Sequence, residues 1–181
     1  VTELNSWGIE FIQGHILDKK FLKKFLHDAD VVHHLAGVTD VAYVKSEANS
    51  DLDKKIIEIG VDGTRNVLEA IPKNCKIIFP STHVVFEGLK KIKKNIIENE
   101  KTFPVLTYAR SKVINEQDID KSVNESVILR LGSVYGYSND TMRINIMPNL
   151  FSKISSQNSV IKLFGGGKQL KSLVNIIDVV R

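Results

Sequence analysis

Residues 108–112 read YARSK and place the phenol of Tyr108 four positions before the ammonium of Lys112. On a helix this spacing brings both side chains to one face, one turn apart. An ordinary phenol has a pKa of about 10, which is too high for a base near neutral pH. A neighbouring cation lowers that pKa, so the pair could take a proton from an alcohol. The alternative interpretation is packing, with the ring directed inward and the lysine stem beside it.

Two hydroxyl side chains, Ser81 and Thr82, end the apolar run that precedes this helix in the chain. Parallel α/β sheets bind ligands at the carboxyl ends of their strands, so both hydroxyls are candidates for ligand contacts. A hydroxyl there can orient a substrate alcohol toward the phenol while hydride leaves the same carbon for a nicotinamide ring. The alternative interpretation is that these hydroxyls only cap the following turn.

Short apolar runs alternate with longer amphipathic ones along the chain, which predicts βαβ units, a parallel sheet and helices on both of its faces. Asp18 is placed as the N-cap of the first of these helices. Ligand contacts are expected just after the apolar runs, at Asp18 and at residues 34–37, 80–83 and 132–136. We expect strands over residues 9–14, 30–37, 75–82 and 126–136, helices over residues 18–29, 53–71 and 107–122, a helix interrupted by Pro148 over residues 141–157, and a short strand entering a helix over residues 172–181.

The bulk properties are those of one compact soluble domain of 181 residues. The net charge of +4 is mild, and the basic run at residues 90–94 is interpreted as a solvated loop, so no nucleic-acid partner is expected. The single cysteine, Cys75, excludes an internal disulfide framework and favours a reducing cytoplasm. No apolar stretch approaches the ~20 residues that span a bilayer, so no membrane partner is expected.

A metal site is not expected at His33 and His34, because adjacent side chains on a strand point to opposite faces. The three glycines at residues 165–167 are interpreted as a turn. A glycine-rich turn between a strand and a helix, which would cradle a phosphate, is absent from the sequence. We therefore interpret the chain as an internal piece of a longer protein.

Seven stretches carry a further pattern: GHILD, DVVHHLAG, GVDGTRNVLEA, PSTHVVFEG, YARSKVINE, LRLGSVYG and GGGKQLKSLVNIIDVV. In this order they resemble the motifs of the extended short-chain dehydrogenase/reductase family, specifically its NAD-dependent epimerase/dehydratase group, which acts on nucleotide sugars. The resemblance implies a Rossmann-type, doubly wound α/β fold. Relative to that fold, the chain lacks the first glycine-rich βαβ portion and most of the small C-terminal substrate lobe.

The resemblance also implies roles for particular residues. Thr82, Tyr108 and Lys112 would be catalytic, and His83 and Lys171 would contact the nucleotide-sugar substrate. The cofactor would be NAD or NADP, and the protein a cytoplasmic homodimer. The cofactor would be held by Asp18, Leu35, Ala36, Gly37, Ser81, Tyr108 and Lys112.

The resemblance implies a division of the chain into three parts. Residues 1–140 would form part of a dinucleotide-binding domain, residues 141–175 would begin the substrate-binding part, and residues 176–181 would return to the first domain. All three would belong to one continuous structural unit.

Several departures from the family pattern bear on the functional interpretation. Gly60 stands in place of an asparagine, His15 in place of an aspartate, and Lys171 in place of an arginine that would grip phosphates in a bidentate manner. His83 and Val84 follow Thr82 where dehydratases of the group carry Asp-Glu, which disfavours 4,6-dehydration. An epimerase and a deoxysugar ketoreductase remain open, as does a non-catalytic dinucleotide-binding regulator or scaffold on the same fold.

Overall fold

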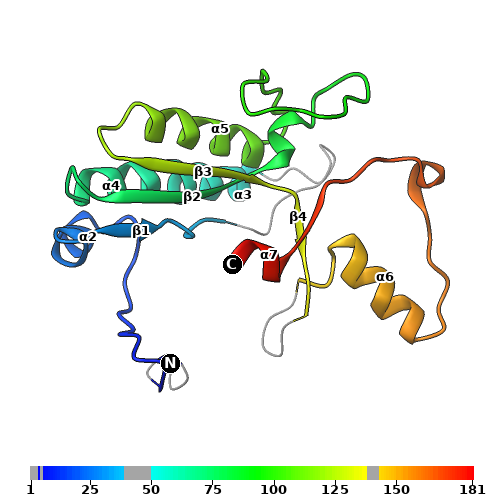
Figure 1. The fold of residues 1–181 in the computed structure, drawn as a ribbon, viewed down its shortest axis with the longest axis horizontal. Coiled ribbons are helices and arrows are strands. Elements are labelled where there is room, and N and C mark those ends of the chain that lie inside the picture. The colour runs from blue at the N-terminus through cyan, green and yellow to red at the C-terminus, as the bar shows by residue number, and fades with distance from the viewer. Residues whose placement is uncertain (1–3, 5, 39–49, 138–142) are drawn as a thin grey trace. The chain divides into compact units, whose positions relative to one another are not determined.

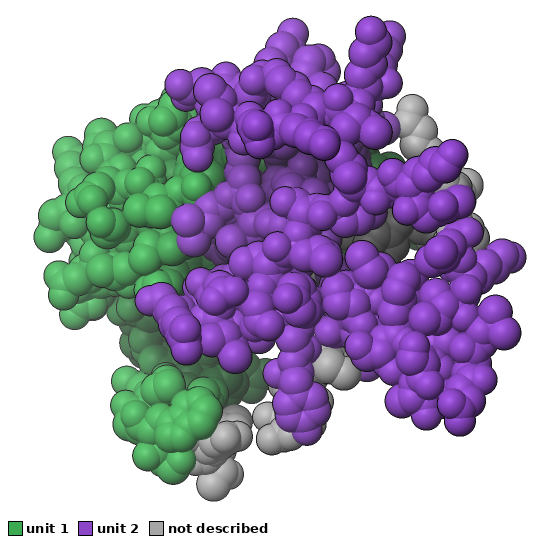
Figure 2. All heavy atoms as spheres, turned by 45° about the vertical axis from the view of Figure 1, so that its right-hand side comes forward, with its two compact units in different colours: residues 1–79, 106–128 green, residues 80–105, 129–181 purple. Residues whose placement is uncertain are grey.

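The computed structural model describes residue 4 and residues 6–38, 50–137 and 143–181. The chain forms two compact units, which Figure 2 distinguishes by colour. The first contains residues 1–79 and 106–128, and the second contains residues 80–105 and 129–181. The predicted division into residues 1–140, 141–175 and 176–181 stays a prediction.

A three-stranded sheet has the order β1-β2-β3, so that β2 lies in the middle (Figure 1). β1 is parallel to β2, with Val32 opposite Ile77. Burial alternates along β2, as expected for a strand with one face on the core. The parallel α/β class of the fold is thereby confirmed. The strands of this sheet are β1 (Val31–His33), β2 (Lys76–Thr82) and β3 (Ser126–Leu131).

Three helices of the first unit, α2, α4 and α5, contribute to one apolar core, which they share with the alternate, inward-facing side chains of β2. The opposite face of the same sheet is more open, because Val31 and Val127 are exposed there. The helical elements are α2 (Lys19–Leu26), α3 (Ser50–Lys55), the π-helix η2 (Ile56–Asp62), α4 (Gly63–Ala70) and α5 (Thr107–Asp120). The buried core consists of Leu22, Val67, Ala70, Ile71, Cys75, Ile77, Phe79 and Ile119.

In the N-terminal part of the chain, the structure confirms one prediction from the sequence and contradicts another. The Asp18 carboxylate accepts hydrogen bonds from the backbone N–H groups of Lys20 and Phe21 at 3.1 and 3.0 Å, which confirms the predicted N-cap. The strand predicted over residues 9–14 is wrong, because these residues are exposed and belong to neither sheet. Apolar periodicity alone does not make a strand without a neighbour to accept its backbone hydrogen bonds.

The second unit contains a two-stranded parallel sheet in which Ser133 of β4 lies opposite Leu173 of β5. The predicted strand over residues 126–136 is interrupted at Gly132, where an added Cβ would lie 2.9 Å from the carbonyl oxygen of Ser172. The elements that lie wholly in this unit are η3 (His83–Phe86), β4 (Ser133–Tyr135), α6 (Met147–Ser156), η4 (Phe164–Gly167), β5 (Leu173–Asn175) and α7 (Ile176–Val180).

The position of Pro148 also differs from the sequence prediction. This residue lies in the first turn of α6, so it begins the helix rather than interrupting it. A proline suits that position because its missing N–H would have no partner within the helix. The predicted strand entering a helix at the end of the chain is confirmed by β5 and α7.

The long loop between η3 and α5 is anchored by backbone hydrogen bonds from Gly88 N–H to the Phe103 carbonyl and from Phe103 N–H to the Val85 carbonyl. Its basic run at residues 90–94 is exposed, as predicted for a solvated loop. Within the described ranges, no helix has the length and apolar character needed to cross a membrane.

Candidate active site

Tyr108 and Lys112 lie on one face of α5, as their spacing predicts. The helix begins at Thr107, after Leu106 in an extended conformation, so Tyr108 belongs to its first turn. The Lys112 ammonium nitrogen Nζ lies 5.8 Å from the centroid of the Tyr108 ring. A positive charge at this distance is in a position to stabilise a phenolate on the same helix face.

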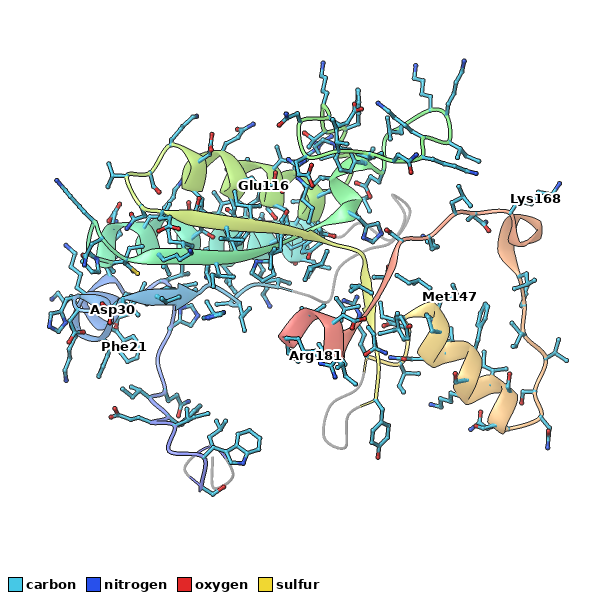
Figure 3. The ribbon with its side chains drawn as sticks, viewed as in Figure 1. Phe21, Asp30, Glu116, Met147, Lys168 and Arg181 are labelled. Atoms are coloured by element: carbon cyan, nitrogen blue, oxygen red, sulfur yellow. The ribbon has the colours of Figure 1, made fainter. Side chains whose placement is uncertain are left out.

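The Lys112 side chain is partly withdrawn from solvent and extends over an aromatic ring. Its Nζ lies 4.4 Å from the centroid of Phe79, a buried residue of β2. Burial lowers the pKa of Lys112 from 10.5 to about 8, and the negative charge of Glu116, which Figure 3 labels on α5, acts in the opposite direction. The ammonium is therefore predominantly charged at neutral pH and loses its proton only in mildly alkaline solution.

His34 follows β1 and is almost completely buried, with 4% of its surface exposed. Its Nε2 lies 2.8 Å from the Thr64 hydroxyl oxygen, and that hydroxyl donates to the Gly60 carbonyl at 2.6 Å. Because the hydroxyl proton is directed to the carbonyl, Nε2 of His34 must be the donor toward Thr64. Burial first, and the charge of Lys112 second, lower the pKa of His34 to about 4. The imidazole is therefore neutral at physiological pH.

The Gly60 carbonyl lies within the π-helix η2 and accepts from two side chains. Besides Thr64, the Asn115 amide of α5 donates to it at 3.1 Å. π-Helical turns are rare and occur often at functional sites. The Asn115 amide oxygen, in turn, is the one buried side-chain N or O atom of the described residues for which no hydrogen-bond partner is found. The hydrogen bonds through Gly60 join α4 and α5.

The second unit holds a separate group of predicted residues. The Thr82 hydroxyl oxygen accepts from the Val84 N–H at 3.3 Å, so it caps η3 and still has its own proton to donate. Nδ1 of His83 lies 3.1 Å from the Leu131 carbonyl, which can only accept, so Nδ1 carries the proton. Burial, together with the charge of Lys171, lowers the pKa of His83, although the bond to Leu131 opposes this shift. His83 therefore presents Nε2 as a neutral acceptor.

Most of the remaining predicted residues lie at or near strand ends, and Asp18 lies at the start of a helix. Leu35, Ala36 and Gly37 directly follow β1 and His34, and all three are exposed. Leu35 has 71% of its surface exposed, and an apolar side chain in this position fits the binding of a dinucleotide across the strand end. Asp18 is exposed as the cap of α2, and Ser81 is buried near the end of β2. The ligand contacts of these residues stay predictions.

Sequence reasoning did not identify Phe79, Thr64 or Asn115 as parts of this arrangement. The available signal for Thr64 was its position four residues after Gly60, which lets its hydroxyl reach a carbonyl one turn earlier. Nothing in the sequence pairs Phe79 with Lys112, because they lie on different elements 33 residues apart. Among the described residues, no group of three or more His, Cys, Asp and Glu side chains is placed to hold a metal ion.

The fold and these side chains define a Rossmann-type α/β protein that carries a tyrosine–lysine pair on a helix beside its parallel sheet. Residues 2–181 match the model of the NAD dependent epimerase/dehydratase family, and the chain belongs to that family.

Two curated relatives cover almost the whole chain. A UDP-N-acetyl-alpha-D-glucosaminuronate decarboxylase of Bacillus cytotoxicus is 27% identical over 96% of this chain and 54% of its own length. A putative UDP-glucose 4-epimerase of Methanocaldococcus jannaschii is 31% identical over 95% of this chain and 57% of its own length. The chain thus spans about half the length of the relatives it matches.

A solved structure is similar as well. The UDP-glucuronic acid 4-epimerase of Bacillus cereus, crystallised as a point mutant with UDP-4-deoxy-4-fluoro-glucuronic acid and NAD, has a TM-score of 0.80 and 26% identity. The match covers 98% of this chain and 55% of the epimerase chain. A nucleotide sugar and NAD are therefore ligands of a structural neighbour.

Proposed function

We propose that this chain is part of an NAD-dependent enzyme that oxidises and re-reduces a nucleotide-activated sugar, most specifically a 4-epimerase. The observation that carries the proposal is the Tyr108–Lys112 pair, whose ammonium lies 5.8 Å from the phenol ring and is partly withdrawn from water. Such a pair suits proton removal from an alcohol near neutral pH. Membership of the epimerase/dehydratase family supports the same chemistry.

In this proposal Tyr108, as phenolate, takes the proton of the sugar hydroxyl while hydride leaves the same carbon. Lys112 lowers the phenol pKa and holds the nicotinamide ribose, and Thr82 donates a hydrogen bond to the reacting oxygen. Bound NAD would supply the hydride acceptor. After the keto sugar has rotated to present its other face, the reduced cofactor would supply the hydride donor. Asp18, Leu35, Ala36, Gly37 and Ser81 would hold this cofactor.

The substrate contacts are assigned to His83 and Lys171. The neutral Nε2 acceptor of His83 suits a sugar hydroxyl, and the Lys171 ammonium suits an anionic group of the nucleotide sugar. The resemblance to the family implies NAD or NADP, a homodimer and a cytoplasmic location, and we include them in the proposal. NAD is favoured because the similar Bacillus cereus epimerase was crystallised with it.

A second candidate is decarboxylation of a nucleotide-activated uronic acid. It is favoured by the 27% identical relative, whose name states that activity and which covers 96% of this chain. The same oxidation at C4 would begin this reaction, because a ketone two bonds from the carboxylate permits loss of carbon dioxide. The Tyr108–Lys112 pair would have the same role in both reactions. Reduction of a keto deoxysugar is a third candidate reaction.

The test is incubation of the full-length protein with NAD and, in turn, UDP-glucose, UDP-glucuronic acid and UDP-N-acetylglucosaminuronic acid, followed by proton NMR of the sugar. We expect a C4 epimer from one of them, and release of carbon dioxide would identify the decarboxylase instead. Tyr108→Phe should abolish either product, whereas Tyr137→Phe, at a tyrosine with 78% of its surface exposed, should not. Undiminished turnover by Tyr108→Phe would refute the proposal.

A further inference from the structure

The ring of Phe79 lies close to two side chains that can carry positive charge. Lys112 Nζ lies 4.4 Å from the ring centroid, and the His34 ring lies 5.6 Å from it at an interplanar angle of 31°. Phe79 belongs to the helix-facing side of β2, and only 1% of its surface is exposed. All three residues lie in the first unit.

This environment makes the interaction between the ring and the ammonium strong. A cation over an aromatic face is stabilised by the negative potential of that face, and the effect grows when water is excluded. Burial and the charge of Lys112 lower the pKa of His34 to about 4, so His34 is neutral at physiological pH and does not compete as a second cation for the ring. Tyr108 and Glu116, both on α5, also act on the ammonium, as does His34 after β1.

We propose that Phe79 is a positioning residue, whose ring holds the Lys112 ammonium in its charged form at the point where it faces Tyr108. The inference rests on the proposed function only for the catalytic role of that ammonium. Burial favours the neutral amine of Lys112, and the ring opposes this tendency. Phe79 thereby extends the range of pH over which the phenolate has a charged neighbour.

The alternative is that Phe79 is only part of the hydrophobic core. Replacement by leucine would not separate the two roles, because it also changes the packing of a buried side chain. Fluorination of the ring separates them, since each fluorine weakens the negative potential of the face while the shape of the side chain is nearly kept. We therefore choose phenylalanine analogues with one, two and three fluorine atoms, incorporated at position 79 of the full-length protein.

Two quantities are measured across this series. The first is the pKa of Lys112, obtained from the pH dependence of its labelling by an amine reagent and read by mass spectrometry of the peptide. The second is the pH at which kcat falls on the alkaline side. We expect the pKa of Lys112 to fall stepwise, by about one pH unit for the trifluoro ring, and the alkaline limb of kcat to move down with it.

The control is the same trifluoro substitution at Phe25, whose ring lies 5.0 Å from the Lys24 ammonium at the surface of α2. It should leave the pKa of Lys112 unchanged. A constant Lys112 pKa across the series at position 79 would overturn the inference. If instead that pKa falls but the kcat profile stays in place, the role of Phe79 stands and the proposed catalytic role of Lys112 is refuted.

Discussion

Acid sensitivity should originate in large part from one buried residue, His34. Its pKa is about 4 in the folded protein, and an unperturbed histidine, as in the unfolded chain, has a pKa of 6.5. Between these two pH values the unfolded chain therefore binds a proton that the folded chain excludes. The stabilising contribution of the neutral imidazole is therefore complete above pH 6.5 and is lost as the pH falls toward 4. The full difference corresponds to about 3 kcal/mol of unfolding free energy, of which about 2 kcal/mol is lost by pH 5.

The assay is urea denaturation of the full-length protein at several pH values from 7.5 to 5, followed by circular dichroism. His34→Gln keeps a donor for Thr64 and removes the titration, so its unfolding free energy should fall less steeply with acid than that of the wild type. His33→Gln is the matched control, because His33 is exposed and lies on the opposite face of β1. Its profile should follow the wild type.

The reasoning would be refuted if His34→Gln and the wild type lost stability in parallel between pH 7.5 and 5. That result would mean that His34 accepts a proton in the folded state despite its burial beside Lys112.

Three further predictions concern stability and turnover. Thr64→Val removes the acceptor of the His34 Nε2–H and should lower the free energy of unfolding, measured by urea denaturation, by about 1–3 kcal/mol. Thr64→Ser should recover most of this loss. An unchanged free energy of unfolding in Thr64→Val would contradict the hydrogen bond. Gly132→Ala should lower Tm, because its Cβ would lie 2.9 Å from the Ser172 carbonyl oxygen. Gly37→Ala should leave Tm unchanged, because no atom lies within 4 Å of its Cβ position. Equal melting curves for the two variants would argue against the tight approach at Gly132. Thr82→Val should lower kcat by about 10²–10³ while Thr82→Ser retains most of it, and a fully active Thr82→Val enzyme would exclude the hydroxyl from the reaction.

The elements that could be predicted well from the sequence are those in which apolar residues recur with a clear period or in which a capping residue marks the start of a helix. Asp18 fixed the start of α2, and β2 and α5 followed from alternation and from helical spacing. The π-helix η2 could not be predicted, because its sequence continues the apolar period of an α-helix and the extra residue per turn depends on contacts with α5. The same limit applies to residues 9–14, whose pattern suits a strand but which belong to neither sheet.

In the candidate site, too, some features could be predicted from local spacing and others depend on contacts made by the fold. Tyr108 and Lys112 were recognisable because four residues make one helical turn, a local rule that needs no knowledge of the fold. The contact of Lys112 with Phe79 depends on how α5 lies on the sheet, which local spacing does not determine. The neutral state of His34 likewise follows from burial and from the charge of Lys112, a residue of another element.

The most direct test of the proposed reaction uses a nucleotide sugar that carries deuterium at C4. The full-length protein is incubated with NAD and this substrate in ordinary water, and the product is analysed by mass spectrometry and NMR. Removal of the C4 hydrogen as hydride, with Tyr108 taking only the hydroxyl proton, predicts that the epimer keeps its deuterium and that turnover is slowed. Loss of the deuterium to water would contradict the account, because it would show that C4 is deprotonated rather than oxidised.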